Sequence, residues 1–325
     1  MHNIIAISVG DIKGIGIEIL IDAWINKKIK NFILFTDIQV LIKYLKNNKK
    51  IINKINIINT NKKINNFEIN KLNVYSFKSR SLEDNTYKSL INAYNFCKQK
   101  LCIGILTLPL NKHSIIRKVD KKFIGHTEFF QKQDKKKFSN MILFHKKIII
   151  SPLTTHIAVN KISKIISKKD YIYNQIININ NTLKIDFNIK KPRLIVSGLN
   201  PHAGEKGKIG FEELKFIKPV IKKLKQKSIM VDGPNSADSI LIKQNLSKYD
   251  CFIFMYHDQA LIPFKFISQF SGVNYTGNLS FIRSSPDHGT AYNLVGSKSI
   301  SQKSFLNSYK LIKKIYKNRK IYEKT

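Results

Sequence analysis

The chain has 325 residues, a formal net charge of +36 and three cysteines without CxxC spacing. It is long enough for two domains or one large α/β unit with a buried core. No apolar run approaches the roughly 18 residues needed to span a bilayer, the N-terminus lacks the pattern of an export signal, and the cysteines suggest neither a disulfide framework nor a thiolate zinc site. We therefore expect a cytoplasmic protein that does not interact with membranes.

Short apolar runs, which predict strands, alternate along the chain with longer amphipathic runs, which predict helices. The predicted strands are 4–9, 32–36, 72–77, 102–107, 141–145, 147–151, 193–198, 228–233 and 251–257. The predicted helices are 16–27, 38–48, 85–100, 170–184, 211–225 and 304–317. This alternation predicts an α/β fold with a largely parallel sheet covered by helices. Ligands of such folds bind outside the carboxyl ends of the strands.

The positive charge is spread over the whole chain. Lysines occur in nearly every segment, and no aromatic-rich RNA motif or zinc finger accompanies them. A solvated surface is therefore the favoured interpretation, and we expect no nucleic-acid partner. A basic nucleic-acid-binding protein remains the alternative, which predicts steeply salt-dependent retention on DNA. A positive field also attracts phosphorylated substrates.

One glycine-rich segment, SVGDIKGIGIE at 8–18, leads from a predicted strand into a predicted helix. Gly14 and Gly16 would let the backbone approach a cofactor closely. The segment matches neither the GxGxxG fingerprint nor a phosphate-binding P-loop. A tight strand-to-helix turn is the simpler interpretation.

Histidines and cations follow several predicted strands. His156, His202 and His257 are candidate ligands of one divalent ion, since neutral imidazole suits zinc or cobalt. Their spacing matches no local metal motif, and a lone loop histidine is more often a hydrogen-bonding group. Lys265 and Arg283 are candidates for anion recognition, because a guanidinium binds carboxylate or phosphate with two parallel hydrogen bonds. A surface arginine is an equal interpretation.

Taken together, these stretches resemble the 4-hydroxythreonine-4-phosphate dehydrogenase (PdxA) family of pyridoxal phosphate biosynthesis. The similar segments follow one another in order over nearly the whole chain: SVGDIKGIGIE, TLPLNK, GHTEFF, TTHIAV, SGLNPHAGEKGKIG, DGPNSADS, YHDQALIPFK and GVNYTGNLSFIRSSPDHGTAYNLVG. The combination of NPHAGE, YHDQ and DHGTA is very specific. Asn293 departs from the family pattern, which commonly has an acidic residue there.

The resemblance implies a homodimer of α/β/α subunits whose two subdomains enclose an active site shared between subunits. His156, His202 and His257 match the ligands of one divalent metal per site (Zn, Co or Mg). The positions that match substrate-binding residues are His126, Thr127, Lys265, Asn274 and Arg283. Asp238 and Asp258 match supporting acidic residues, and Lys112 is a further candidate for the cleft.

The glycine-rich start and HGTAYNLVG also resemble the cofactor segments of the isocitrate and isopropylmalate dehydrogenase group, which binds NAD without a Rossmann fingerprint. This likeness implies NAD or NADP near the positions Gly14, Gly16, His288, Gly289 and Thr290. It also implies one subdomain with both termini, 1–125 plus 296–325, and a second at 126–295.

The activity implied by the resemblance is oxidation of 4-phosphooxy-L-threonine by NAD, followed by loss of carbon dioxide. A related dehydrogenase acting on another small phosphorylated acid, such as erythronate or threonate phosphate, is the nearest alternative.

Overall fold

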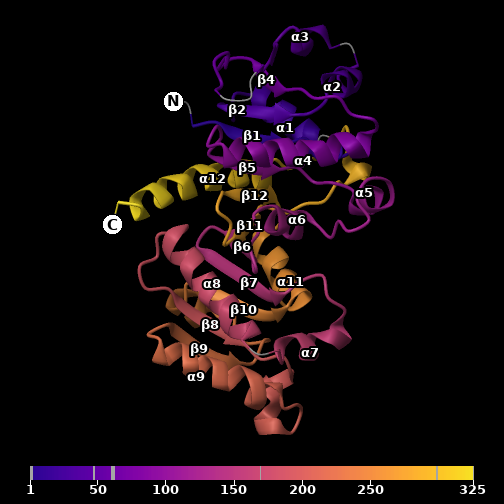
Figure 1. Ribbon diagram of the computed structural model, residues 1–325. Coiled ribbons are helices and arrows are strands. Elements are labelled where there is room, and N and C mark those ends of the chain that lie inside the picture. Colours follow the sequence, from indigo (N-terminus) through magenta and orange to yellow (C-terminus); the bar gives the residue numbers. More distant parts are fainter. Residues whose placement is uncertain (1–2, 47, 60–62, 169, 298, 325) are drawn as a thin grey trace. The chain divides into compact units, whose positions relative to one another are not determined.

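The computed structural model describes residues 3–46, 48–59, 63–168, 170–297 and 299–324 (Figure 1). The chain forms two compact units, each assembled from separate segments. Unit 1 comprises Met1–Asp134 and Leu279–Lys317, and unit 2 comprises Lys135–Asn278 and Asn318–Thr325. Among the described residues, no helix is long and apolar enough to cross a bilayer.

Unit 1 is built on parallel strands in the order β3-β4-β2-β1-β5-β12. These strands are β1 (Ile5–Ser8), β2 (Phe32–Phe35), β3 (Ile55–Ile57), β4 (Leu72–Tyr75), β5 (Gly104–Thr107) and β12 (Arg283–Pro286). The helices are α1 (Ile15–Ile25), α2 (Ile38–Tyr44), α3 (Lys49–Ile52), α4 (Leu82–Lys98), α5 (Lys112–Lys118), α6 (His126–Gln133), η4 (Tyr292–Leu294) and α12 (Lys303–Tyr322), whose last residues belong to unit 2. Strands β1, β2 and β5 are buried throughout, as expected of strands covered on both faces.

Unit 2 has the strand order β11-β6-β7-β10-β8-β9. Its strands are β6 (Asn140–His145), β7 (Ile148–Thr154), β8 (Arg193–Ser197), β9 (Met230–Asn235), β10 (Cys251–Tyr256) and β11 (Val273–Gly277). The helices are η1 (Val159–Lys161), α7 (Ile162–Ile166), α8 (Tyr171–Ile185), η2 (Pro201–Gly207), η3 (Glu213–Ile217), α9 (Lys218–Gln226), α10 (Lys243–Lys248) and α11 (His257–Ser268). The pairs β6–β7 and β6–β11 are antiparallel, and β7, β10, β8 and β9 run parallel.

The α/β fold class with a mostly parallel sheet is therefore confirmed. The antiparallel pair β6–β7 arises because only Lys146 and Lys147 separate the two strands, which leaves room for a hairpin and not for a crossover helix. The single helix expected at 211–225 instead begins as the π-helix η3 and continues as α9. Pro219, in the first turn of α9, has no backbone N–H to continue regular α-helical bonding.

The boundaries between the units differ from those expected from the sequence, 125/126 and 295/296. Helix α6 belongs to unit 1 because Phe129 and Phe130 are buried in the aromatic core of that unit. Phe281 joins the same core, with its ring 5.5 Å from Phe130 and 5.3 Å from Tyr94. The segment before β12 is thereby held in unit 1 as well.

Candidate active site

The three candidate metal ligands all lie in unit 2, beyond the carboxyl ends of neighbouring parallel strands. His156 follows β7, His257 follows β10 and His202 lies in the segment that follows β8. These strands are adjacent in the order β7-β10-β8, so their carboxyl ends share one edge of the sheet. Topology thus brings to one edge three residues that lie far apart in the sequence.

His156 and His257 lie close together. Tyr256 pairs with Thr154 across β10 and β7, so His257 lies one residue and His156 two residues beyond paired positions. Their ring centroids are 5.9 Å apart. Nδ1 of His257 lies 2.6 Å from Oδ1 of Asp258, which leaves Nε2 for a ligand. This carboxylate–imidazole arrangement is typical of metal-binding histidines, whose second nitrogen is held by an acidic partner.

His202 is exposed, in a turn of unusual backbone conformation. His202, Ala203, Glu205 and Lys206 have φ values of 50°, 50°, 42° and 56°, in the left-handed region that L-residues seldom adopt. Within the described ranges, no three His, Cys, Asp or Glu side chains are placed to hold a metal ion. One chain therefore does not assemble the predicted three-histidine site, and ligation shared between two subunits stays a prediction.

Unit 1 contains a buried cationic group. Arg283, at the start of β12, is 1% exposed, and its Nε and NH2 groups donate to Thr107 Oγ1 at 3.2 and 2.7 Å. Burial lowers the pKa of Arg283 to about 9, so the guanidinium stays charged at neutral pH. A buried charge at the carboxyl end of β5 is suited to an anionic ligand.

His126, the first residue of α6, is half-buried in the same unit. Burial, and then the positive charge of Arg283, hold its pKa well below the ordinary value, so the imidazole is neutral at pH 7. Its Nε2 atom is buried and, among the described residues, has no hydrogen-bond partner. A buried polar atom of this kind is expected to find its partner in a ligand or water.

The remaining predicted substrate and supporting residues are divided between the units. Thr127 and Lys112 are half-buried in unit 1, at the starts of α6 and α5. Lys265 lies in α11 of unit 2, with Nζ 5.1 Å from the centre of the Phe270 ring. Asn274 lies in β11, and its Oδ1 is buried without a hydrogen-bond partner among the described residues. Asp238 is exposed in the turn after β9.

The two predicted cofactor segments are in direct contact within unit 1. The N–H of Ile15 donates to the carbonyl of Thr290 at 3.0 Å. A Cβ atom on Gly14 would lie 2.7 Å from that carbonyl oxygen, and one on Gly16 would lie 3.1 Å from Pro109. These two glycines are therefore explained by close packing of the loops. Gly289, beside His288, has open space where a Cβ would be, so a ligand can approach the backbone there.

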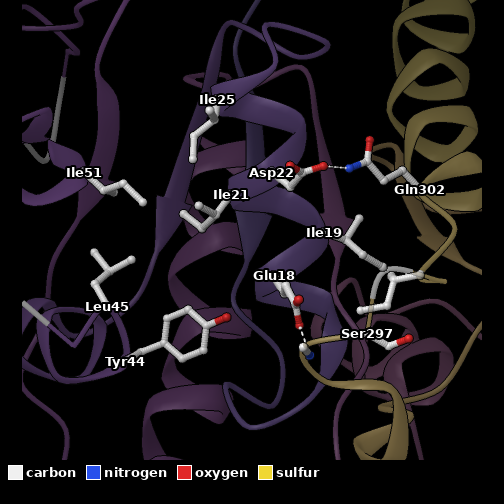
Figure 2. Close-up of a pocket in the computed structure, with 12 residues that line it drawn as sticks. Glu18, Ile19, Ile21, Asp22, Ile25, Tyr44, Leu45, Ile51, Ser297 and Gln302 are labelled. Carbon is white, nitrogen blue, oxygen red and sulfur yellow. Dashed lines mark hydrogen bonds between the residues drawn. The ribbon is translucent and has the colours of Figure 1, made fainter. Parts of the chain in front are cut away.

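A pocket of about 580 Å³ lies beside α1, where the segment 296–302, which begins with the last residue of the HGTAYNLVG stretch, is attached (Figure 2). Glu18 accepts the N–H of Gly296 at 3.0 Å, and Asp22 accepts a hydrogen bond from Gln302. Both carboxylates point from α1 toward this segment, while Ile21 and Ile25 form an apolar wall (Figure 2). The pocket borders the predicted cofactor segments.

Sequence reasoning missed several residues that organise these sites. Thr107 holds Arg283, and Glu213 and Gln259 hold the segment that leads to His202. Thr107 lies in TLPLNK and Gln259 in YHDQ, two of the stretches that resemble the PdxA family. Their place beside candidate ligands in these stretches could have indicated a supporting role. Glu213 lies beyond the end of its stretch.

Comparison with known proteins decides the family. The family model described as "Pyridoxal phosphate biosynthetic protein PdxA" matches residues 28–312. The chain belongs to this family. It is 36% identical over 312 residues to the 4-hydroxythreonine-4-phosphate dehydrogenase of Wigglesworthia glossinidia brevipalpis. This match covers 92% of this chain and 92% of that protein. It is 38% identical over 216 residues to that of Bacteroides thetaiotaomicron, a match that spans 66% of this chain and 59% of that protein.

A solved structure supports the PdxA fold. The 4-hydroxythreonine-4-phosphate dehydrogenase of Klebsiella pneumoniae has a TM-score of 0.82 and 26% identity, with 97% of this chain and 98% of that chain covered. The expectation that the chain resembles the PdxA family is thereby confirmed. The names of these relatives support an oxidoreductase. The finer likeness to the isocitrate and isopropylmalate dehydrogenase group stays a prediction.

Proposed function

We propose that this PdxA-family protein oxidises the C3 hydroxyl of 4-phosphooxy-L-threonine, with NAD or NADP as the acceptor. When held near His288, Gly289 and Thr290, the dinucleotide would supply a two-electron acceptor for the hydride at C3. With release of the hydroxyl proton, the product would be 2-amino-3-oxo-4-phosphooxybutanoate. Loss of carbon dioxide from this β-keto acid gives 3-amino-2-oxopropyl phosphate, a precursor of pyridoxal 5′-phosphate. Membership of the PdxA family and the names of the relatives support this activity.

The observation that carries the proposal is the pair His156 and His257 at the ends of two adjacent strands. Imidazole donors 5.9 Å apart between ring centroids, one of them held by Asp258, fit zinc or cobalt. We propose that His156, His202 and His257 hold one divalent ion. When bound, such an ion lowers the pKa of an alcohol that it coordinates.

The other polar groups would bind and orient the substrate. Arg283 supplies a buried positive charge for the phosphate or carboxylate, and Lys265 a second cation. Because His126 is neutral, its buried Nε2 can either donate or accept a hydrogen bond without introducing another charge. Holding a substrate in a reactive orientation can contribute several kcal/mol to catalysis.

The activity is tested with metal-depleted protein, to which zinc, cobalt or magnesium is returned before substrate and NAD are added. NADH formation should require the metal and should be lost in His257→Ala, while His113→Ala, at an exposed histidine of unit 1, keeps it. Erythronate 4-phosphate and threonate 4-phosphate in the same assay decide between the proposed substrate and its nearest alternative. Full activity of His257→Ala without added metal contradicts the proposal.

We propose that the active protein is a homodimer. Ile262 and Phe266, four residues apart on α11, are 71% and 79% exposed, and Phe270, two residues beyond the end of the helix, is 58% exposed. Ile262 and Phe266 lie on one face of the helix that begins with His257, and exposed apolar residues of this kind are typical of a protein interface. Phe266→Glu should give a smaller molar mass in light scattering, while Ile25→Glu, at an exposed apolar residue of unit 1, should not. Equal masses for Phe266→Glu and the wild type would contradict this interface.

The cytoplasm is the proposed location. All three cysteines are buried and free, as expected in a reducing compartment.

A further inference from the structure

The segment between β8 and His202 is held by a buried carboxylate. Glu213, at the start of η3, is 1% exposed. Its Oε1 accepts the backbone N–H groups of Leu199 and Asn200, both at 2.8 Å, and its Oε2 accepts Asn200 Nδ2 at 3.0 Å. Buried carboxylates are costly unless such donors satisfy them, so this arrangement is specific.

Two glycines leave the space that this carboxylate occupies. A Cβ atom on Gly198 would lie 3.0 Å from Glu213 Oε1, and one on Gly204 would lie 2.6 Å from Oε2. Gly198 precedes His202 and Gly204 follows it, so the Glu213 carboxylate contacts the loop on both sides of the histidine. This packing explains why SGLNPHAGE has a glycine at each of these positions.

The turn that presents His202 has an unfavourable backbone conformation. The φ values of His202 and Ala203, both 50°, lie in a region that is unfavourable for L-residues. A conformation of this kind persists only where the surroundings impose it. The contacts of Glu213 with residues 198–200 and 204 supply that constraint.

Gln259 also contacts the segment that leads to His202, at Gly198. Its Nε2 donates to the Gly198 carbonyl at 3.1 Å, and its Oε1 accepts the N–H of Met255 at 2.9 Å. Gln259 lies in the first turn of α11, the helix that begins with His257. The start of the His202 loop is thus joined to the elements that carry His257.

We propose that Glu213 is a positioning residue that sets the metal affinity of the site through the backbone of the His202 loop. The inference rests on the proposed function, in which His202 is a metal ligand. Glu213 is not one of the proposed ligands, because its carboxylate is buried against the loop. It holds residues 198–204 in the one conformation that presents His202, so that metal binding need not order the loop.

The neighbouring Glu212 provides a matched control. Its oxygens accept from the side chains of Asn200 and Ser163, both at 2.8 Å. Glu213→Gln retains the shape, but one oxygen replaces two as the acceptor for three donors, and the amide nitrogen adds a donor beside Asn200 Nδ2. Glu212→Gln removes the same charge without taking an acceptor from a backbone N–H of residues 198–204. The two substitutions remove the same charge from adjacent positions of the full-length protein.

The test titrates metal-depleted wild type, Glu213→Gln and Glu212→Gln with Co²⁺ in competition with a chromophoric chelator. We expect affinity for Co²⁺ to fall roughly 10- to 100-fold in Glu213→Gln, the usual effect of losing a residue that orients a ligand. Glu212→Gln should stay close to the wild type. In the metal-free proteins, amide exchange at Leu199 and Asn200 should accelerate in Glu213→Gln alone.

The outcomes separate the inference from the proposed function. If the wild type binds no Co²⁺, the proposed metal centre is wrong and the inference falls with it. If the wild type binds and Glu213→Gln binds equally tightly, or if both variants weaken binding equally, the inference alone is overturned. Glu213→Asp provides a second variant should Glu213→Gln fail to fold. It keeps the charge but withdraws the oxygens by one methylene, so unchanged affinity in it would also contradict the role.

Discussion

The contact between Thr107 and Arg283 permits a quantitative prediction. Thr107 is fully buried, and its Oγ1 accepts two N–H groups of a guanidinium that is 1% exposed. Thr107→Val replaces this oxygen by a methyl group of similar size, so the main change is the loss of an acceptor for a buried charge. A hydrogen bond to a charged group contributes about 1.5–3 kcal/mol. We expect the free energy of unfolding to fall by about that amount.

Thr107→Ser is the matched control, because it keeps the hydroxyl and loses only a methyl group. Chemical denaturation of both variants measures stability, and initial rates against substrate concentration measure KM and kcat. If Arg283 binds the substrate, a misplaced guanidinium should raise KM. A loss of about 1.5–3 kcal/mol in binding free energy corresponds to a roughly 10- to 150-fold increase, since each factor of ten is about 1.4 kcal/mol. Serine should recover most of both effects. Equal behaviour of the valine and serine variants would refute the reasoning, since it would show that the oxygen does not matter.

Two further predictions concern unit 1. The pKa of His126 is lowered by burial in the folded protein, so the unfolded chain binds more protons below about pH 6.5 and stability falls as the pH drops. His126→Gln should remove up to about 1.4 kcal/mol per pH unit of this dependence, measured by denaturation between about pH 6.5 and 5. An unchanged slope would show that His126 is not buried as a neutral ring. Gly14→Ala should destabilise the protein by about 1–3 kcal/mol because its Cβ would lie 2.7 Å from the Thr290 carbonyl oxygen. Gly289→Ala, where a Cβ meets open space, should change the melting temperature little, and equal losses would contradict the packing explanation.

The elements that were predictable from the sequence are those with a clear apolar pattern. Strands such as β2 (FILF) and β10 (CFIFMY) are continuous apolar runs and were located within a residue or two. Strand β12 was missed because its sequence, RSSP, is polar although the strand is buried. Helix α11 was missed because it begins directly at the end of β10 and contains Pro263, which normally argues against a helix.

The histidine pair shows what sequence alone leaves open. His156 and His257 were both expected at strand ends, but the pairing of β7 with β10 decides that they meet. Strand order depends on how helices such as α8 cover the sheet, and no local pattern records it. Glu213 was missed for the same reason. Its role depends on contacts with a turn more than ten residues earlier in the chain, and a glutamate in a predicted helix looks like any surface residue.

The distribution of charge in the structure supports the interpretation of the lysine excess as a surface property. Among the described residues, the buried carboxylates are Asp37, Asp134, Asp186 and Glu213. Each holds the chain together locally: Asp37 accepts the N–H of Ser79, Asp134 that of Ser280 and Glu213 that of Leu199, while Asp186 pairs with Arg319. A buried carboxylate with several donors is costly to replace, whereas an exposed side chain can become lysine with little effect on stability. These four carboxylates therefore stand at positions where the fold requires an acceptor.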